Sequence, residues 1–255
     1  MLRCRVRPHL VASVSTVALA IASAVSATSA WAATPTVPSG ATPSAASPAV
    51  RGAMAGAAAR LPRCGWAQDS TLLALFQSGQ RFPEFLAAAK ARREGWLKMA
   101  DSAQVSASLV ARAKAVGGSW SLLVVAVDAC GDSMNNVPYL AKLSELVPGL
   151  DLRIVLPANG RPVQASHRSL DGRTATPTFV LLDQAGNDVG CIVELPREIR
   201  DWAHGVRGTV SSDSLHAGIR AFYAANRGVA ITTEAVEMLE AAKAGTPRCA
   251  RGRAP

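Results

Sequence analysis

The sequence has no C-x-x-C motif and no cluster of cysteine and histidine residues at metal-binding spacing, so a zinc site is not expected. It also lacks a basic stripe interleaved with aromatic residues, although its formal net charge is +9. The arginines are scattered, which indicates a solvated basic surface and no nucleic-acid partner. Beyond the N-terminal region, no apolar run is long enough to span a bilayer, and no internal repeat is visible.

The N-terminus has the three regions of a secretory signal peptide. Three arginines within the first seven residues precede an uncharged apolar run over residues 10–27, and Ala30-Trp31-Ala32 forms a cleavage site before Ala33. The alternative is a retained membrane anchor, because the apolar run is near spanning length. Its alanine and serine content makes it only weakly hydrophobic, which favours cleavage. Residues 1–32 are therefore predicted to be a signal peptide for periplasmic or secreted export.

The remaining length fits one medium-sized domain with appendages. Residues 33–60 consist mainly of Ala, Pro, Ser, Thr and Gly without periodicity and are predicted to form a disordered linker. A folded domain is expected over residues 61–249, with its core at 119–226 and a tail at 250–255.

The domain is organised around residues 120–138. The apolar, valine-rich run Leu122–Val127 predicts a buried strand, and apolar residues at helical spacing follow Ser133. Cys130 thus lies where a strand ends and a helix begins. Free backbone N–H groups and the helix dipole stabilise an anion there, so Cys130 is a candidate nucleophilic thiolate. Asp132, in the first helical turn, complements the dipole, but its charge opposes a thiolate.

Further along the chain, strands and helices alternate as in α/β proteins. The expected elements are a strand at 152–156, a helix at 161–170, a strand at 178–182, a turn at 183–187 and a strand at 188–194. The turn, centred on Ala185-Gly186, makes the last two strands a hairpin. Thr176-Pro177 stands directly before an apolar strand. The proline is therefore a candidate for a cis peptide bond, or for a residue that limits hydrogen bonding at the edge of the sheet.

Helices are expected on both sides of this segment. They cover residues 70–79, 83–96, 104–116, 213–225 and 233–243. The predicted N-caps are Asp69-Ser70 for the first helix, Ser212 or Asp213 for the fourth, and Thr232 or Thr233 for the last. The stretch from Glu194 to Ser212 is predicted to be a long irregular loop.

This ordered set of elements resembles the thioredoxin family. Cys130 matches the first cysteine of the family's C-x-x-C motif, Ser133 falls at the second, and Thr176-Pro177 matches the residue–cis-proline pair beside that thiol. More narrowly, the chain resembles a bacterial thioredoxin-like group with a W-C-G-D-C or W-C-G-D-S signature and extra helices at both ends. Two departures stand out, because Ala129 replaces the usual tryptophan and the second cysteine is absent.

The resemblance implies an α/β thioredoxin-like fold, with a central mixed four-stranded sheet flanked by helices. In such proteins the second cysteine resolves the mixed disulfide formed by the first, which Ser133 cannot do. The hydroxyl of Ser133 can still donate a hydrogen bond to the Cys130 thiolate. Thr176 and Pro177 would hold an extended substrate peptide. The resemblance therefore implies a monothiol oxidoreductase or isomerase that acts on protein thiols or disulfides, with glutathione as a further thiol partner and no cofactor.

The alternative is a redox-inactive thioredoxin-like module that holds a peptide at the Pro177 edge. The missing resolving thiol favours this module, whereas a cysteine at a helix start favours the enzyme. Alkylation of Cys130 across pH discriminates between the two, because only the enzyme needs an accessible and acidic thiol.

Four other polar residues have a structural and a functional interpretation. Asp128 ends the strand before Cys130, where it is equally well a proton relay or a solvated loop carboxylate. His167, His204 and His216 have no partner at catalytic or metal-binding spacing. They are expected at the surface or at helix caps.

Four cysteines remain once Cys4 leaves with the signal peptide, and disulfides persist in an oxidising compartment. Cys64 and Cys249 flank the domain, so they are a candidate disulfide that joins its ends; the alternative is two exposed thiols in the tails. Cys191 lies in the middle of a strand and is expected to be a small buried hydrophobic residue. The alternative is that Cys191 resolves the mixed disulfides of Cys130.

Overall fold

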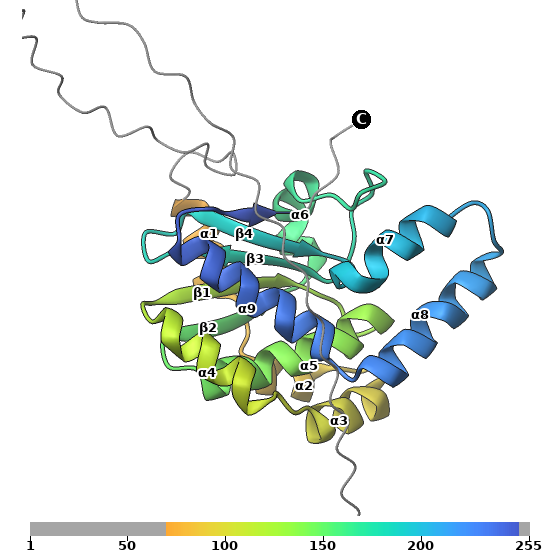
Figure 1. Ribbon diagram of the computed structural model, residues 1–255, viewed down its shortest axis with the longest axis horizontal. Helices are drawn as coiled ribbons and strands as arrows, with labels where there is room; N and C mark the ends of the chain where they lie inside the picture. The colour runs from red at the N-terminus through yellow and green to blue at the C-terminus, as the bar shows by residue number, and fades with distance from the viewer. Residues whose placement is uncertain (1–69, 250–255) are drawn as a thin grey trace, which may run out of the picture. The chain divides into compact units, whose positions relative to one another are not determined.

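The computed structural model describes residues 70–249, in which five strands form one mixed sheet of order β2-β1-β3-β4-β5 (Figure 1). The strands are β1 (Trp120–Val125), β2 (Leu150–Val155), β3 (Thr178–Leu182), β4 (Asp188–Val193) and β5 (Arg248–Cys249). β1 and β2 are parallel, β3 is antiparallel to β1 and β4, and β5 runs parallel to β4. The predicted α/β fold is confirmed, but the four-stranded sheet is corrected to five strands by the short β5.

Helices surround this sheet. They are α1 (Ser70–Ser78), α2 (Phe82–Ala88), α3 (Arg93–Ser102), α4 (Ala107–Val116), α5 (Gly131–Leu146), α6 (Pro157–Ser166), α7 (Arg197–Val206), α8 (Ser212–Asn226) and α9 (Val229–Lys243). Among the residues described, no helix combines the length and the apolar character needed to cross a bilayer. The predicted signal peptide, linker and tail, and Asp69 and Cys64 with them, lie outside the described residues.

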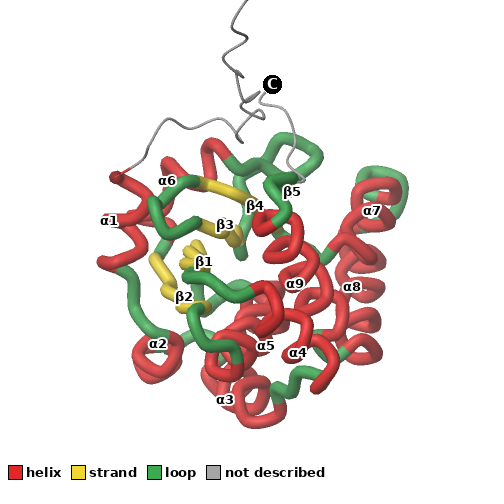
Figure 2. The backbone as a smooth tube through the Cα atoms, turned by 60° about the vertical axis from the view of Figure 1, so that its left-hand side comes forward, coloured by secondary structure: helices red, strands yellow, loops and turns green. Residues whose placement is uncertain are grey.

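Both faces of the sheet are covered by helices (Figure 2), which explains the continuous apolar run in β1. Because successive strand side chains point to opposite faces, Leu122 and Val124 enter the larger core, beside α3, α4, α5 and α9. Leu123 and Val125 enter the second core, beside α1 and α6. All four side chains are buried. β1 is thereby fixed between β2 and β3 inside the sheet, and its carboxyl end leads to Cys130.

Three predictions about the helices were wrong in detail. The stretch predicted as a loop after Glu194 contains α7, which packs with α8 in a small separate core that includes Leu195, Ile199 and Ala203. These three residues recur every four positions, which is the helical signal that the loop prediction overlooked. The helix predicted over residues 83–96 is divided into α2 and α3, because Arg92 between them adopts a left-handed conformation.

The last helix begins earlier than its predicted threonine caps. Gly228, with φ of 81°, occupies the N-cap of α9, and a Cβ atom there would collide with the ring of Tyr139. Thr232 lies one turn inside the helix, where its hydroxyl donates to the Gly228 carbonyl at 2.7 Å. Close packing against α5 therefore sets this boundary, and the side chain that caps the first turn is Asn226, which accepts the N–H of Ala230 at 2.8 Å.

Candidate functional site

The turn that leads into Cys130 is attached to the loop between α2 and α3 through Asp128. The Asp128 carboxylate accepts the backbone N–H groups of Lys90, at 2.7 Å, and Ala91, at 2.8 Å. These two donors, led by Lys90, lower the pKa of Asp128 below its ordinary value. Asp128 therefore anchors this turn and is not simply a solvated loop carboxylate, while its role as a proton relay stays a prediction.

Two side chains from the N-terminal helices hold the same turn by its carbonyl groups. The Trp96 indole N–H donates to the Asp128 carbonyl at 2.8 Å, and the Arg92 guanidinium donates to the Ala129 carbonyl at 2.7 Å. Trp96 is fully buried and Ala129 is exposed. The helices that precede the sheet thus position the residues just before the thiol.

Cys130 is the N-cap of α5, as the strand-to-helix pattern predicted. Its Sγ accepts the backbone N–H of Ser133 at 3.4 Å, and the thiol donates to the Thr176 carbonyl at 3.1 Å. The side chain is partly exposed, and Cys130 is the one free cysteine in residues 70–249. The geometry therefore unites a thiol, a helix N-terminus and the Thr176-Pro177 segment in one place.

Ser133 differs from its prediction. Its side chain is fully buried, and within residues 70–249 its hydroxyl has no hydrogen-bond partner. The donor to Sγ is the backbone N–H of Ser133, because the first turn of a helix directs its free N–H groups toward the N-cap. The predicted hydrogen bond from the Ser133 hydroxyl to Cys130 is therefore absent from this part of the chain.

The carboxyl of Asp132 lies close to buried polar groups of α5 and α8. Burial raises its pKa from 3.8 to about 6, while the hydroxyl of Tyr223 acts in the opposite direction. The Asn136 amide donates to the Tyr223 hydroxyl at 2.9 Å and to the Asp132 carbonyl at 3.0 Å. Burial, and secondarily the charge of Asp132, raise the pKa of Tyr223. Burial thus moves the ionisation of Asp132, two residues after the thiol, toward neutral pH.

The Thr176-Pro177 peptide bond is cis, as its place before β3 suggested, and Pro177 is buried. The Pro177 carbonyl accepts the N–H of Glu194 at 2.8 Å, while the Thr176 carbonyl is the acceptor for Cys130. The structure thus brings Thr176 and Cys130 together. Whether Thr176 and Pro177 bind a substrate stays a prediction.

A groove of about 770 Å³ lies beside this site, between α3, α5 and α8. Gly131 and Asp132, which directly follow Cys130, belong to its lining. Apolar side chains also line it, among them Met99, Met134 and Ile219. The groove is therefore large enough for several side chains of a peptide and adjoins the start of α5.

The charges around this groove are predominantly positive. Arg92, Lys98, Arg220 and Arg227 line it, whereas its only acidic lining residue is Asp132. Lys98, Arg220 and Arg227 have no carboxylate partner within residues 70–249. The groove therefore offers uncompensated positive charge next to the thiol.

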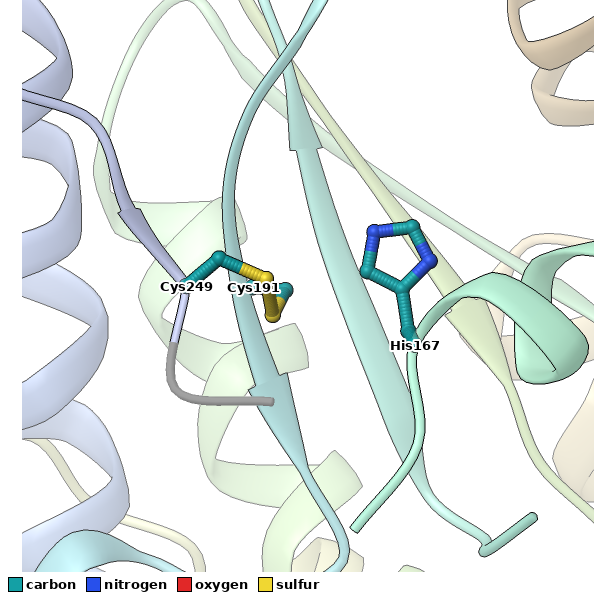
Figure 3. A group of neighbouring side chains, drawn as sticks. All are labelled: His167, Cys191 and Cys249. Atoms are coloured by element: carbon teal, nitrogen blue, oxygen red, sulfur yellow. A yellow bond between two sulfur atoms is a disulfide. The ribbon is translucent and has the colours of Figure 1, made fainter. Parts of the chain in front are cut away.

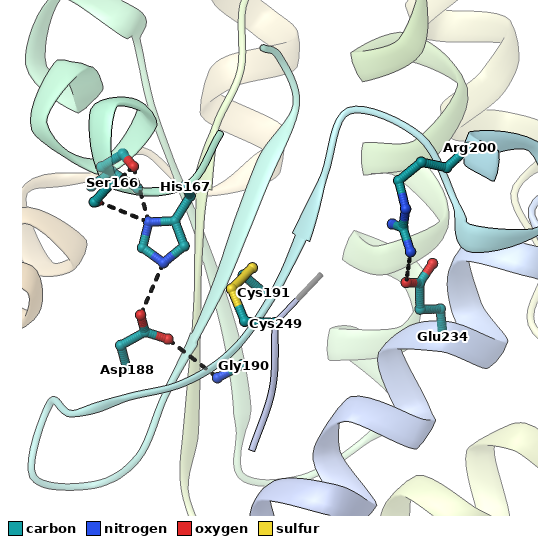
Figure 4. Close-up of a disulfide and its surroundings, with 9 residues drawn as sticks. Ser166, His167, Asp188, Gly190, Cys191, Arg200, Glu234 and Cys249 are labelled. Carbon is teal, nitrogen blue, oxygen red and sulfur yellow. Dashed lines mark hydrogen bonds and ion pairs between the residues drawn. A yellow bond between two sulfur atoms is a disulfide. The ribbon is translucent and has the colours of Figure 1, made fainter. Parts of the chain in front are cut away.

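The predicted Cys64–Cys249 disulfide is corrected by the structure, in which Cys249 is bonded to Cys191 (Figure 4). The chain returns after α9 and adds β5 to β4, and the register places Cys191 opposite Cys249 with 4.4 Å between their Cα atoms. Cys191 is buried in the core, as predicted, but it is bonded to Cys249, so it is not a free thiol that could resolve the mixed disulfides of Cys130. Cys64 lies outside the described residues.

The three histidines were expected at the surface or at helix caps. His204 and His216 are exposed, as expected. His167 is the C-cap residue of α6, but it is buried, with 1% of its surface accessible, and Figure 3 shows it beside the two bonded cysteines. The sequence spacing gave no signal for this grouping, because the three residues come from the end of α6, from β4 and from β5.

The comparisons with known proteins agree with this architecture. A family model described as Thioredoxin matches residues 79–211, which include Cys130 and Pro177. The chain is similar to the crystal structure of a protein of unknown function from Pseudomonas aeruginosa, with 21% identity and a TM-score of 0.54 over 66% of this chain and 96% of that one. A second similar structure is an HIV epitope-scaffold, with 20% identity and a TM-score of 0.53 over the same shares of 66% and 96%. No curated protein matches the chain.

Proposed function

This chain belongs to the thioredoxin family, and on that premise we propose that it is an exported monothiol thiol–disulfide oxidoreductase or isomerase with Cys130 as its nucleophile. The observation that carries the proposal is the setting of Cys130 at the N-cap of α5, with the Ser133 N–H directed at Sγ. A helix N-terminus stabilises a thiolate, which is the reacting form of cysteine. The signal-peptide pattern of residues 1–32 supports export.

The proposed reaction is thiol–disulfide exchange. The Cys130 thiolate attacks one sulfur of a partner's disulfide, a mixed disulfide forms, and the other sulfur of the partner leaves as a thiolate. A thiol of the partner then attacks the mixed disulfide, forms a new disulfide within the partner and frees Cys130. The partner begins and ends with the same number of disulfides and Cys130 is regenerated, so this isomerisation needs no external oxidant.

The resolving thiol has to come from outside residues 70–249. Ser133 carries no thiol, and Cys191 is bonded to Cys249. This favours reactions in which the partner supplies the second thiol.

A redox-inactive peptide-binding module is the second candidate. The hydrogen bond from the Cys130 thiol to the Thr176 carbonyl favours it, because this bond holds the sulfur in its protonated, less reactive form.

We further infer that the partner presents an acidic segment to the groove beside α5. Lys98, Arg220 and Arg227 lack carboxylate partners within the described residues, so acidic side chains of a polypeptide would complement them. Met99, Met134 and Ile219 provide apolar surface for neighbouring residues of the same segment. Because Gly131 and Asp132 line the groove, a segment bound there lies near Cys130.

The proposal is tested with full-length protein and a peptide disulfide that carries acidic residues. Wild-type protein should form a mixed disulfide at Cys130, detected by non-reducing peptide mass spectrometry, and Cys130→Ser should form none. Cys64→Ser is the matched control and should behave as wild type. Unchanged trapping in Cys130→Ser would leave the binding module as the better interpretation.

Ser133→Cys gives a gain-of-function test. Ser133 is fully buried and its hydroxyl makes no hydrogen bond within residues 70–249, so a thiol at that position loses no polar contact there. The variant should reduce insulin in the presence of dithiothreitol, whereas the wild type should show little activity above the reductant alone. Equal activity of the two proteins would mean that another thiol already resolves the mixed disulfide.

A further inference from the structure

His167, Cys191 and Cys249 converge at the edge of the sheet far from Cys130 in the chain. One side-chain nitrogen of His167 and the two sulfurs all lie within 4.8 Å of one another. Figure 3 shows His167 and the two bonded cysteines as neighbouring side chains. His167 and Cys191 are buried, and Cys249 is partly buried. Imidazole and thiolate are the ligands that Zn²⁺ prefers in proteins.

The hydrogen bonds of His167 fix which ring nitrogen is available to a metal. Nδ1 lies 2.9 Å from the carbonyl oxygen of Val163, and since a carbonyl only accepts, Nδ1 carries a proton. Nε2 lies 2.9 Å from the carboxylate of Asp188 (Figure 4). Metal-binding histidines commonly donate from the second ring nitrogen to a backbone carbonyl, which orients the ring. His167 already has this arrangement at Nδ1, so Nε2 is the candidate ligand, and a bound metal would replace its hydrogen bond to Asp188.

Asp188 supplies a carboxylate next to that nitrogen. Its side chain is fully buried, one oxygen faces His167, and the other accepts the N–H of Gly190 at 3.2 Å. Within the described residues, no Lys or Arg pairs with this carboxylate. This carboxylate lies beside the imidazole but outside the group of three ligand atoms, so it would accept the proton that His167 gives up when a metal binds Nε2.

The disulfide controls whether the sulfurs are ligands. In the bonded state neither sulfur is a thiolate, so the group cannot hold a metal through them. Both cysteines pack in the second core, and Cys249 is only partly buried, so a reductant or an ion would approach the pair from Cys249. In a tetrahedral zinc site the ligand atoms lie about 3.3–3.8 Å apart, so after reduction the two sulfurs have to separate, while the imidazole moves closer to them.

We propose that residues His167, Cys191 and Cys249 form a redox-gated zinc site, which is closed by the disulfide and opened by its reduction. A dithiol reductant transfers two electrons and two protons to the disulfide, gives two thiols and is itself oxidised to a disulfide. Zn²⁺ then binds the two sulfurs and Nε2, and it displaces both thiol protons and the proton shared by His167 and Asp188. The bound ion replaces the disulfide as the link between β4 and β5.

The test uses full-length protein and Co²⁺, a spectroscopic substitute for Zn²⁺. Protein reduced with a phosphine under nitrogen should bind one Co²⁺, with the visible bands of a tetrahedral ion and near-ultraviolet thiolate-to-cobalt absorption, and Zn²⁺ should displace it. Oxidised protein should give neither signal. A reduced wild type without these bands, or an oxidised protein with them, would contradict the proposal.

Variants locate the site. Cys249→Ser should lose most of the thiolate absorption, and His167→Gln should weaken Co²⁺ binding at least tenfold, whereas Cys130→Ser and Cys64→Ser should bind as wild type. Reduced wild-type protein is the reference for folding by circular dichroism, since it already lacks the disulfide. Loss of the signal in Cys130→Ser or Cys64→Ser would place the metal elsewhere.

A second measurement needs no variant. In reduced wild-type protein, Zn²⁺ should slow alkylation of Cys191 and Cys249 at least tenfold and leave Cys130 unchanged, as read by peptide mass spectrometry. Equal protection of Cys130, or no protection of the pair, would overturn the assignment. This outcome is independent of the proposed function, which rests on Cys130 alone.

Discussion

The molecule holds sulfur in two settings, and the fold treats them differently. Cys130 is a free, partly exposed thiol at the N-cap of α5, where a backbone N–H and a carbonyl contact its sulfur. Cys191 and Cys249 are bonded to each other at the sheet edge, beside the buried His167. The same residue type therefore serves as a candidate nucleophile in one place and as a cross-link in the other, and the backbone around each sulfur decides which.

The supports of the two sites differ as well. Hydrogen bonds from Lys90 and Ala91 to Asp128 hold the turn before Cys130. In contrast, β5 is two residues long, so its attachment to β4 depends on the covalent bond. Removal of the cross-link should therefore cost stability, whereas removal of the free thiol should cost activity.

The largest effect on stability is expected for Cys249→Ser. The disulfide spans 58 residues of sequence, and in the chain-entropy account its loss lowers the free energy of unfolding by about 4 kcal/mol. Cys130→Ser should change it by less than about 1 kcal/mol, because the thiol is partly exposed and unbonded. Urea unfolding of both variants without reductant measures the difference. Equal losses would remove the distinction between the two sites.

The next effect concerns the charge beside Cys130. The folded protein binds the Asp132 proton more tightly than the unfolded chain does, because burial raises the folded pKa from 3.8 to about 6. The free energy of unfolding should therefore increase as the pH falls from above 6 toward 4, by up to about 3 kcal/mol. Asp132→Asn should abolish this dependence and be more stable than wild type at pH 7. Urea unfolding at several pH values tests it, and an unchanged profile in the variant would assign the dependence to another group.

The same substitution should sharpen the contrast between the two sulfur sites. At pH 7, Asp132→Asn removes a negative charge next to Cys130, and alkylation of that thiol should accelerate several-fold. The Cys191–Cys249 bond should remain intact in the same samples. Peptide mass spectrometry after timed alkylation measures both the alkylation rate of Cys130 and the integrity of the disulfide. A slower reaction of Cys130 in Asp132→Asn than in wild type would contradict the electrostatic role of Asp132.

The smallest effect is expected in the groove. Arg220→Glu should weaken binding of an acidic peptide about three- to tenfold at low salt, with a smaller difference at high salt, because exposed charges are screened. Lys114→Glu, which changes an exposed cation of α4 outside the groove, is the matched control and should have little effect. Fluorescence anisotropy with a labelled peptide measures both. Equal losses in the two variants would indicate a general effect of net charge.

The sequence was informative where local pattern determines structure. The apolar run before Cys130, the helical spacing after it and the proline before β3 predicted the site, because each depends on residues adjacent in the chain. The Cys191–Cys249 bond depends on how the chain returns after α9, which no local pattern encodes. The burial of His167 depends likewise on β4, and Gly228 replaces the predicted threonine caps because of its contact with Tyr139.

Direct labelling of the native protein tests the central claim, that Cys130 is the reacting thiol. Full-length protein without reductant is treated with dithiodipyridine for increasing times, and mixed disulfides are located by non-reducing peptide mass spectrometry. Cys130 should be modified first, while the peptide that joins Cys191 to Cys249 stays intact. A Cys130 that reacts only after denaturation, or a Cys191–Cys249 bond that opens before Cys130 is modified, would contradict the account.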